Sequence, residues 1–108
     1  MKKEFSHLDI LVNNSGLIKN NREVHESGVE MTFMVNHFGP FYLTYNLFGL
    51  LSKSKEGRIV NVSSLMHEYT DKYIADDIDC SQGWSSTESY SRSKLANVMF
   101  TFSLADRF

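Results

Sequence analysis

The sequence predicts an α/β fold that contains part of a parallel, doubly wound sheet. Two apolar runs of strand length, Leu8–Asn13 and Arg58–Ser63, are separated by a long segment with helical periodicity, and a second helical segment follows Ser85. The order strand, helix, strand, loop, helix is typical of parallel strands joined by a right-handed crossover. Because two strands alone make a poor sheet, we expect this unit to belong inside a larger open sheet.

Both predicted strands are continuously apolar and rich in branched residues. The first ends at Asn-Asn-Ser-Gly, and the second is preceded by Glu56-Gly57 and ends at Ser63. Continuous apolarity over this length is typical of a strand that is covered on both faces. We therefore expect helices against both sides of the sheet.

A helical segment connects the two strands. Ser27 and Glu30 match a capping box, which places the start of the helix at Ser27, and apolar residues keep a helical period as far as Leu51. Pro40 interrupts this segment. Since proline has no N–H, the carbonyl of Asn36 loses its regular helical donor and the helix is expected to kink.

The polar segment from Met66 to Glu88 is predicted to be a long surface loop with at most short turns. Loops of this length in compact domains are often functional. Ser85 and Glu88 match a second capping box, so the last helix is expected to begin there and to run toward the C-terminus.

Composition limits the class of protein. The chain has 108 residues, of which 42% are apolar, and we treat residues 1–108 as a single partial domain. A formal net charge of −2 gives no reason to expect nucleic acid as a partner. Cys80 is the only cysteine, which fits a reducing compartment, and the four histidines show no metal-ligand spacing.

Tyr90 and Lys94 are four positions apart on the last predicted helix and therefore share a face. A phenol has an ordinary pKa near ~10, and a neighbouring ammonium group would lower it. The pair could then serve as a general acid and base. The spacing alone is common, so the interpretation depends on its context.

That context is polar residues at the carboxyl ends of both predicted strands. Asn13-Asn14-Ser15-Gly16 follows the first strand, and Ser63-Ser64 ends the second. In open α/β sheets, ligands bind outside the carboxyl ends of the strands. A serine hydroxyl at this edge can bind a substrate carbonyl. A plain turn and a plain strand end remain the alternatives.

Four motifs stand in order along the chain: Leu-Val-Asn-Asn-Ser-Gly, Val-Asn-His-Phe-Gly-Pro-Phe, Arg-Ile-Val-Asn-Val-Ser-Ser and Tyr-Ser-Arg-Ser-Lys-Leu-Ala-Asn. Together they resemble the short-chain dehydrogenase/reductase family, in particular its retinol dehydrogenase-like branch. The resemblance extends from about His7 to Phe108. It implies a partial Rossmann-type fold and an oxidoreductase that transfers a hydride between a nicotinamide cofactor and an alcohol or carbonyl substrate.

The resemblance implies four catalytic residues. Asn36 matches the helix asparagine of the family's tetrad, and Ser64 matches the serine that orients and polarises the substrate carbonyl. Tyr90 matches the acid/base. Lys94 matches the lysine that binds the nicotinamide ribose and lowers the pKa of the tyrosine.

The resemblance also implies cofactor contacts. Asn14, Ser15 and Gly16 match the Asn-Asn-Ala-Gly turn that lines the cofactor ribose, with Ser15 in place of alanine, and Tyr90 and Lys94 complete the set. The cofactor is NADP or NAD, with NADP favoured by the branch. No metal is needed, because the phenol and the serine hydroxyl polarise the oxygen.

Pro40 acquires a functional interpretation within this resemblance. The family is thought to use the carbonyl of the residue that matches Asn36 to hold a water that relays protons to the lysine. We therefore expect Pro40 to reinforce a functional kink that frees this carbonyl. The alternative is that Pro40 only bends a core helix.

Two departures from the family pattern matter. Tyr90 follows Ser64 by 26 residues, a longer segment than most members have, which suits the retinol dehydrogenase-like branch and is expected to shape the substrate entrance. Nothing before Asn14 resembles the Thr-Gly-x-x-x-Gly-x-Gly turn that holds the pyrophosphate. The sequence is therefore read as a central and catalytic segment that lacks the N-terminal nucleotide-binding half.

The expected substrate is a small lipophilic alcohol or carbonyl compound such as a retinoid or steroid. The resemblance also implies a homodimer through the two long helices and an intracellular location, cytoplasmic or associated with the endoplasmic reticulum, while membrane attachment is left open. Two alternatives remain: a catalytically incompetent chain that acts as an interaction module, and an extended-type sugar-nucleotide epimerase or dehydratase, which shares Tyr-x-x-x-Lys.

Overall fold

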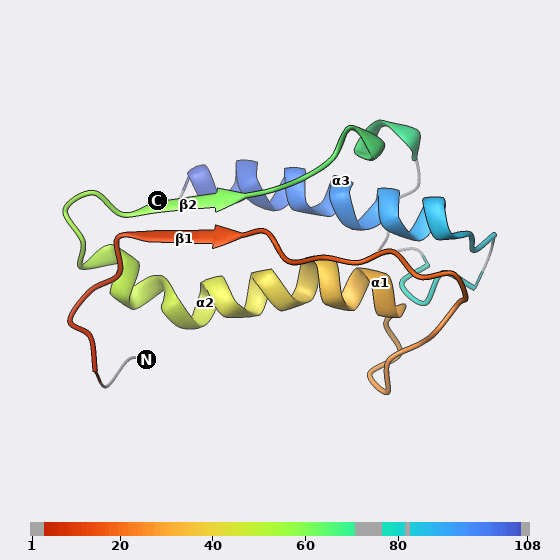
Figure 1. Ribbon diagram of the computed structural model, residues 1–108, viewed down its shortest axis with the longest axis horizontal. Helices are drawn as coiled ribbons and strands as arrows, with labels where there is room; N and C mark the ends of the chain where they lie inside the picture. Colours follow the sequence, from red (N-terminus) through yellow and green to blue (C-terminus); the bar gives the residue numbers. More distant parts are fainter. Residues whose placement is uncertain (1–3, 71–76, 82, 107–108) are drawn as a thin grey trace.

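The computed structural model describes residues 4–70, 77–81 and 83–106. Two parallel strands and their crossover form the first part of the fold, and a turn and a long helix form the second (Figure 1). The elements in chain order are β1 (Ile10–Asn13), α1 (Met31–Phe33), the π-helical turn η1 (Met34–Phe38), α2 (Gly39–Ser52), β2 (Arg58–Asn61), the 3-10 turn η2 (Leu65–Tyr69) and α3 (Ser86–Ala105). The predicted order of elements is confirmed.

The strands pair in parallel with Ile10 opposite Arg58 and Asn13 opposite Asn61. Both are shorter than the apolar runs that predicted them. The backbone N–H of Val62 still donates to the carbonyl of Asn13 at 3.0 Å, so the two chains stay together beyond the ends of the ladder. The carboxyl ends of both strands therefore lie at one edge, as a crossover connection requires.

Only one face of the sheet is covered within the described residues. Leu11 and Asn13 are buried, whereas Ile10 and Val12 are 57% and 54% exposed, and Val60 on β2 is 47% exposed. The expectation that both faces would be covered is wrong for this chain. The apolar run needs cover on both faces, but the described helices supply it on one.

The apolar core is divided into two small clusters. One joins β1 to α2 through Leu11, Leu47, Leu50 and Leu51. The other joins α1 to α3 through Val29, Phe33 and Ala96. The radius of gyration is 14.9 Å, against about 13 Å for a compact domain of about 100 residues. The chain is thus elongated, and in Figure 1 β2 crosses in front of α3 while β1 runs beside α2.

The crossover helix begins later than the capping box predicted. Glu30, not Ser27, caps it, by accepting the N–H of Phe33 at 2.9 Å. Gly28 adopts a positive φ of 91°, and the backbone of Met31 donates to Glu23 at 2.7 Å. A left-handed residue and this extended pairing are incompatible with a helix through residues 27–30.

The predicted irregularity at Pro40 is confirmed as a π-helical turn. The N–H of Gly39 donates to the carbonyl of Met34, five residues earlier, and Pro40 stands in the first turn of α2. Proline is tolerated at that position, because first-turn N–H groups have no partner within the helix. Asn36 lies within the π-helical turn.

The predicted start of the last helix is also confirmed. Ser85 caps α3 by accepting the N–H of Glu88 at 3.0 Å. Part of the predicted loop, residues 71–76 and 82, lies outside the described residues, and its first turn is η2. None of the helices described is long and apolar enough to cross a membrane.

Candidate active site

Asn36 joins the end of β1 to α3. Its side chain is fully buried, accepts the N–H of Leu17 at 2.8 Å and donates to the Leu17 carbonyl at 2.8 Å. The same amide group donates to Ser93 Oγ at 3.1 Å. The Asn36 amide thus binds both the N–H and the carbonyl of Leu17. It thereby fixes the turn that follows β1 against η1 and α3.

Lys94 and Tyr90 lie together on one face of α3, as their spacing predicted. Lys94 Nζ lies 5.3 Å from the centre of the Tyr90 ring. Lys94 is only 5% exposed, and this burial lowers the pKa of its ammonium group. The helix thus presents a phenol ring and a desolvated lysine as neighbours.

Gly16 closes this group from the side of the strand. A Cβ on Gly16 would lie 3.2 Å from Asn36 Oδ1 and 3.5 Å from Lys94 Nζ. The first distance is shorter than a usual contact of a Cβ atom, and the second is an ordinary van der Waals contact. A glycine therefore lets the turn after β1 approach Asn36 and Lys94 at once.

Asn14 and Ser15, the other predicted cofactor residues, are exposed beside Gly16. The neighbouring Asn13 has a structural role instead. Its side-chain amide donates to Thr44 Oγ1 at 3.0 Å and to Asn61 Oδ1 at 2.7 Å. These bonds tie the end of β1 to α2 and β2, which leaves Asn14 and Ser15 to face solvent.

Ser64 follows β2 and caps η2. Its Oγ accepts the N–H of Met66 at 3.2 Å, and its carbonyl lies 2.6 Å from His67 Nδ1. The preceding residue, Ser63, donates its hydroxyl to the Lys94 carbonyl at 3.0 Å. The end of β2 is therefore pinned to α3 at the turn that carries Lys94.

The structure thus brings Gly16, Asn36, Tyr90 and Lys94 into one group and places Ser64 next to the strand end that touches α3. Sequence reasoning placed Ser63 at the end of the second strand without a structural role, and it missed Leu17 and Ser93, which also hold this group together. Ser93 donates to the Tyr90 carbonyl at 2.6 Å while it accepts from Asn36. The position of Ser93, one residue before Lys94, was the only signal in the sequence that could have indicated this role.

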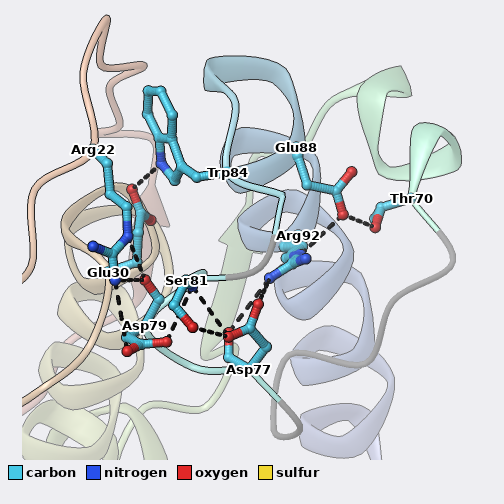
Figure 2. Close-up of polar contacts among 9 residues, drawn as sticks. All are labelled: Arg22, Glu30, Thr70, Asp77, Asp79, Ser81, Trp84, Glu88 and Arg92. Carbon is cyan, nitrogen blue, oxygen red and sulfur yellow. Dashed lines mark hydrogen bonds and ion pairs between the residues drawn. The ribbon is translucent and has the colours of Figure 1, made fainter.

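The opposite face of α3 carries a buried ion pair. The Arg92 side chain is 1% exposed, and its Nε lies 2.9 Å from Glu88 Oε1, while Nη1 lies 3.5 Å from Asp77 Oδ2 (Figure 2). Thr70 also donates to Glu88 Oε1 at 2.8 Å. Arg92 therefore anchors both described ends of the long segment between β2 and α3.

A second set of polar contacts fixes the same segment to the crossover. Trp84 Nε1 donates to Glu30 Oε2 at 3.2 Å, and Arg22 donates to the carbonyl of Asp79 at 3.0 Å (Figure 2). The Ile78 carbonyl accepts the N–H of Glu30 at 3.1 Å. Residues 77–81 and Trp84 are thereby held between α1 and α3, close to the start of the helix that carries Tyr90.

Among the residues described, no group of three or more histidine, cysteine, aspartate or glutamate side chains could hold a metal ion. The site is therefore built from hydroxyl, amide, phenol and ammonium groups. Such a set can bind the hydroxyls of a sugar and exchange a proton with an alcohol or carbonyl oxygen.

Comparison with protein families decides the relationship. The family model of the short chain dehydrogenases matches residues 1–108. The chain belongs to the short-chain dehydrogenase family. Retinol dehydrogenase 14 of Homo sapiens is 46% identical over 107 residues, which cover 99% of this chain and 32% of that protein. The corresponding mouse protein (Mus musculus) is 44% identical and is covered to 31%.

Solved structures share the fold. A protein from Mycobacterium paratuberculosis superposes with a TM-score of 0.79 at 33% identity, over 97% of this chain and 38% of that one. A short-chain dehydrogenase from Escherichia coli, complexed with NADPH, gives a TM-score of 0.68 at 26% identity, over 98% and 40%. The predicted partial Rossmann fold and the retinol dehydrogenase-like branch are confirmed. The chain spans about a third of the length of the curated relatives it matches.

Proposed function

We propose that the protein is an oxidoreductase that transfers a hydride between NADP or NAD and an alcohol or carbonyl carbon. The observation that carries the proposal is Lys94, whose buried ammonium group lies over the Tyr90 ring and against Gly16. Asn36 supports the same group, because its side chain accepts the backbone N–H of Leu17 in the turn after β1. The match to the short-chain dehydrogenases over residues 1–108 favours this proposal over a sugar-nucleotide epimerase.

The residues present fit the nicotinamide end of a dinucleotide. Gly16 leaves open the space that a side chain would fill, and Lys94 Nζ at its edge offers donors to ribose hydroxyls. Asn14 and Ser15 add exposed polar groups at the same strand end. When bound, the nicotinamide supplies or accepts the hydride. The Escherichia coli relative that is complexed with NADPH supports NADP as the first cofactor to test.

Tyr90 and Ser64 handle the substrate oxygen in this proposal. The Tyr90 hydroxyl donates a proton to a carbonyl oxygen during reduction and removes it from an alcohol during oxidation. Since Ser64 Oγ accepts the N–H of Met66, its hydroxyl hydrogen can be directed at the same oxygen. Lys94, as an ammonium group, stabilises the negative charge of a phenolate.

A lipophilic alcohol or aldehyde is the proposed substrate class. Support comes from the retinol dehydrogenases among the relatives, two of which are named above. Asp77, which pairs with Arg92, and Trp84, which bonds Glu30, lie beside α3 where they can border the substrate entrance. Retinaldehyde is therefore the first substrate to test.

The experiment uses a hybrid protein in which residues 1–108 replace the matching segment of human retinol dehydrogenase 14. We expect NADPH-dependent reduction of retinaldehyde and a loss of kcat of at least about 100-fold in Tyr90→Phe. Tyr42→Phe is the matched control, because Tyr42 is 69% exposed on α2 and should leave kcat unchanged. A Tyr90→Phe hybrid with full activity would refute the proposed function.

We also propose that a second copy of the protein covers α2 and α3. These helices expose Tyr45 and Phe102, which are 74% and 72% accessible, and between them lies an open apolar groove of about 640 Å³ that Phe41, Phe48 and Phe100 line. Sedimentation of the hybrid should give a dimer, and Phe102→Glu should give a monomer. A wild-type monomer would contradict this assignment.

A further inference from the structure

The carbonyl of Asn36 has a partner that the sequence did not reveal. Pro40 cannot donate to it, and the sequence therefore predicted a freed oxygen. In the structure, Asn97 Nδ2 donates to this oxygen at 3.0 Å. The expectation of a free carbonyl is thus wrong, because a side chain from α3 replaces the lost helical donor.

The Asn36 carbonyl determines the orientation of the Asn97 amide, because a carbonyl oxygen can only accept and must face Nδ2. Asn97 Oδ1 lies 3.0 Å from His37 Nδ1, and an amide oxygen can only accept, so Nδ1 carries the hydrogen. A flipped amide would place its oxygen against the Asn36 carbonyl. Asn97 is 6% exposed, so water does not readily replace either bond. His37, Asn97 and Asn36 therefore form a directed chain of hydrogen bonds.

His37 is well suited to hold this chain. Its ring packs against Phe33 at 5.1 Å and Phe100 at 6.0 Å between centres, and burial lowers the pKa of His37 although the bond to Asn97 partly opposes this. Burial therefore disfavours the protonated imidazole, and the Asn97 oxygen accepts the Nδ1–H.

Ser93 and Asn97 both form hydrogen bonds with Asn36, one with its side chain and one with its backbone. They are four positions apart on α3 and thus share a face. Ser93 Oγ accepts from the Asn36 side chain, and Asn97 donates to the Asn36 backbone. Two bonds from one helix face fix both the position and the rotation of Asn36, whose Oδ1 holds the Leu17 N–H beside Gly16 and Lys94.

We propose that Asn97 is a positioning residue of the active site. Its side-chain amide, whose oxygen is bonded to His37, replaces the helical donor that Pro40 removes and holds the π-helical turn so that Asn36 keeps the Gly16 turn in place against Lys94. The role in the reaction rests on the proposed function. The role in positioning rests on the hydrogen bonds alone.

The test compares Asn97→Asp with Asn46→Asp in the hybrid protein. Asn97→Asp keeps an acceptor for His37 but removes both N–H donors and places an oxygen against the Asn36 carbonyl. Asn46 is the matched control, since its amide also donates to a backbone carbonyl, that of Tyr42 at 2.8 Å on α2, far from the site. Asn97→Gln restores a donor on a longer side chain.

Two measurements are made on each variant. The first is hydrogen exchange of the Leu17 amide, which is protected through Asn36. We expect Asn97→Asp to accelerate it about tenfold or more, Asn46→Asp to leave it unchanged, and Asn97→Gln to restore part of the protection. The second is steady-state kinetics, in which Asn97→Asp should lower kcat about 10- to 100-fold with KM for retinaldehyde changed less than about threefold.

The outcomes separate the two claims. Unchanged Leu17 exchange in Asn97→Asp overturns the positioning role whatever the activity, and accelerated exchange with an unchanged kcat overturns its importance for the reaction. A wild-type hybrid without oxidoreductase activity refutes the proposed function, while Leu17 exchange still decides the positioning role. If Asn97→Asp does not fold, Asn97→Ser, which is too short to reach the carbonyl, takes its place.

Discussion

Asn36 Oδ1 lies 3.2 Å from the point at which Gly16 would carry a Cβ. This relationship explains why a glycine stands at the carboxyl end of β1. The turn must come close enough for the Leu17 backbone to bond the Asn36 amide, and Lys94 Nζ lies 3.5 Å from the same point. A glycine here serves close approach, since no positive φ is found at this position.

Gly16→Ala tests this closeness. The added methyl group should displace the Asn36 side chain by a few tenths of an ångström, and we expect the hybrid to bind NADPH about tenfold more weakly, a loss of about 1.4 kcal/mol. Gly49→Ala is the control, because nothing lies within 4 Å of a Cβ on Gly49 within α2. That change should leave binding unaltered and stabilise the helix by about 0.5–1 kcal/mol. Isothermal calorimetry and urea unfolding measure both effects, and equal affinities for NADPH would contradict the prediction.

Arg92 should contribute strongly to stability, and Arg22 should not. Arg92→Met leaves Glu88 and Asp77 without their buried guanidinium partner, so we expect the free energy of unfolding to fall by about 3–5 kcal/mol. The control is Arg22→Met, which removes an exposed pair with Asp79 and should cost about 1 kcal/mol or less.

Urea unfolding of the hybrid protein measures the two changes side by side. Similar losses for the two arginines would show that the Arg92 network is not the anchor of the segment between β2 and α3. The pair of variants is informative because both arginines contact residues 77–79 of the same segment (Figure 2).

Local patterns predicted the parts of the fold that depend on neighbours in sequence. The Ser85 cap, the pairing of Tyr90 with Lys94 and the break at Pro40 all follow from spacings of three to five residues. The Ser27 cap failed because a left-handed Gly28 and pairing with Glu23 override the capping pattern. Tertiary contacts of this kind leave no local signal.

The residues that support the site could not be predicted from the sequence for the same reason. Asn97 lies 61 positions from Asn36, and Ser63 lies 31 positions from Lys94. Only Pro40 indicated that a donor from elsewhere was needed for the Asn36 carbonyl. The sequence therefore predicted that the Asn36 carbonyl lacks its helical donor, but it did not predict that Asn97 supplies another donor.

Pro40→Ala returns an N–H that can bond the Asn36 carbonyl, four residues earlier. This donor competes with the Asn97 amide and favours a regular helix over the π-helical turn, so we expect kcat of the hybrid to fall about threefold to tenfold and its pH–rate profile to shift. In an Asn97→Asp background the same change should instead recover activity, because the new N–H takes the unpaired oxygen. Additive losses in the double variant, or an unchanged pH–rate profile in Pro40→Ala, would contradict this account.

Lys94 should lower the stability of the protein, although it takes part in the proposed reaction. Burial lowers the pKa of Lys94 below its ordinary value of 10.5, so the folded state holds the Lys94 proton less tightly than the unfolded state does. The cost of burying the charge is fully present below the folded-state pKa, decreases as the pH rises through the window that ends at 10.5, and vanishes above it. Without cofactor, we therefore expect Lys94→Met to melt at a higher temperature than the wild type at pH 7, although it loses activity.

The pH dependence distinguishes this cost from a simple packing effect. The difference in melting temperature between Lys94→Met and the wild type should narrow as the pH rises toward 10.5, because the wild type loses its buried charge over that range. Lys53→Met, at an exposed position after α2, should show no such narrowing. A difference that stays constant with pH would mean that methionine only packs better. Equal melting temperatures at pH 7 would mean that Lys94 is not desolvated in the absence of cofactor.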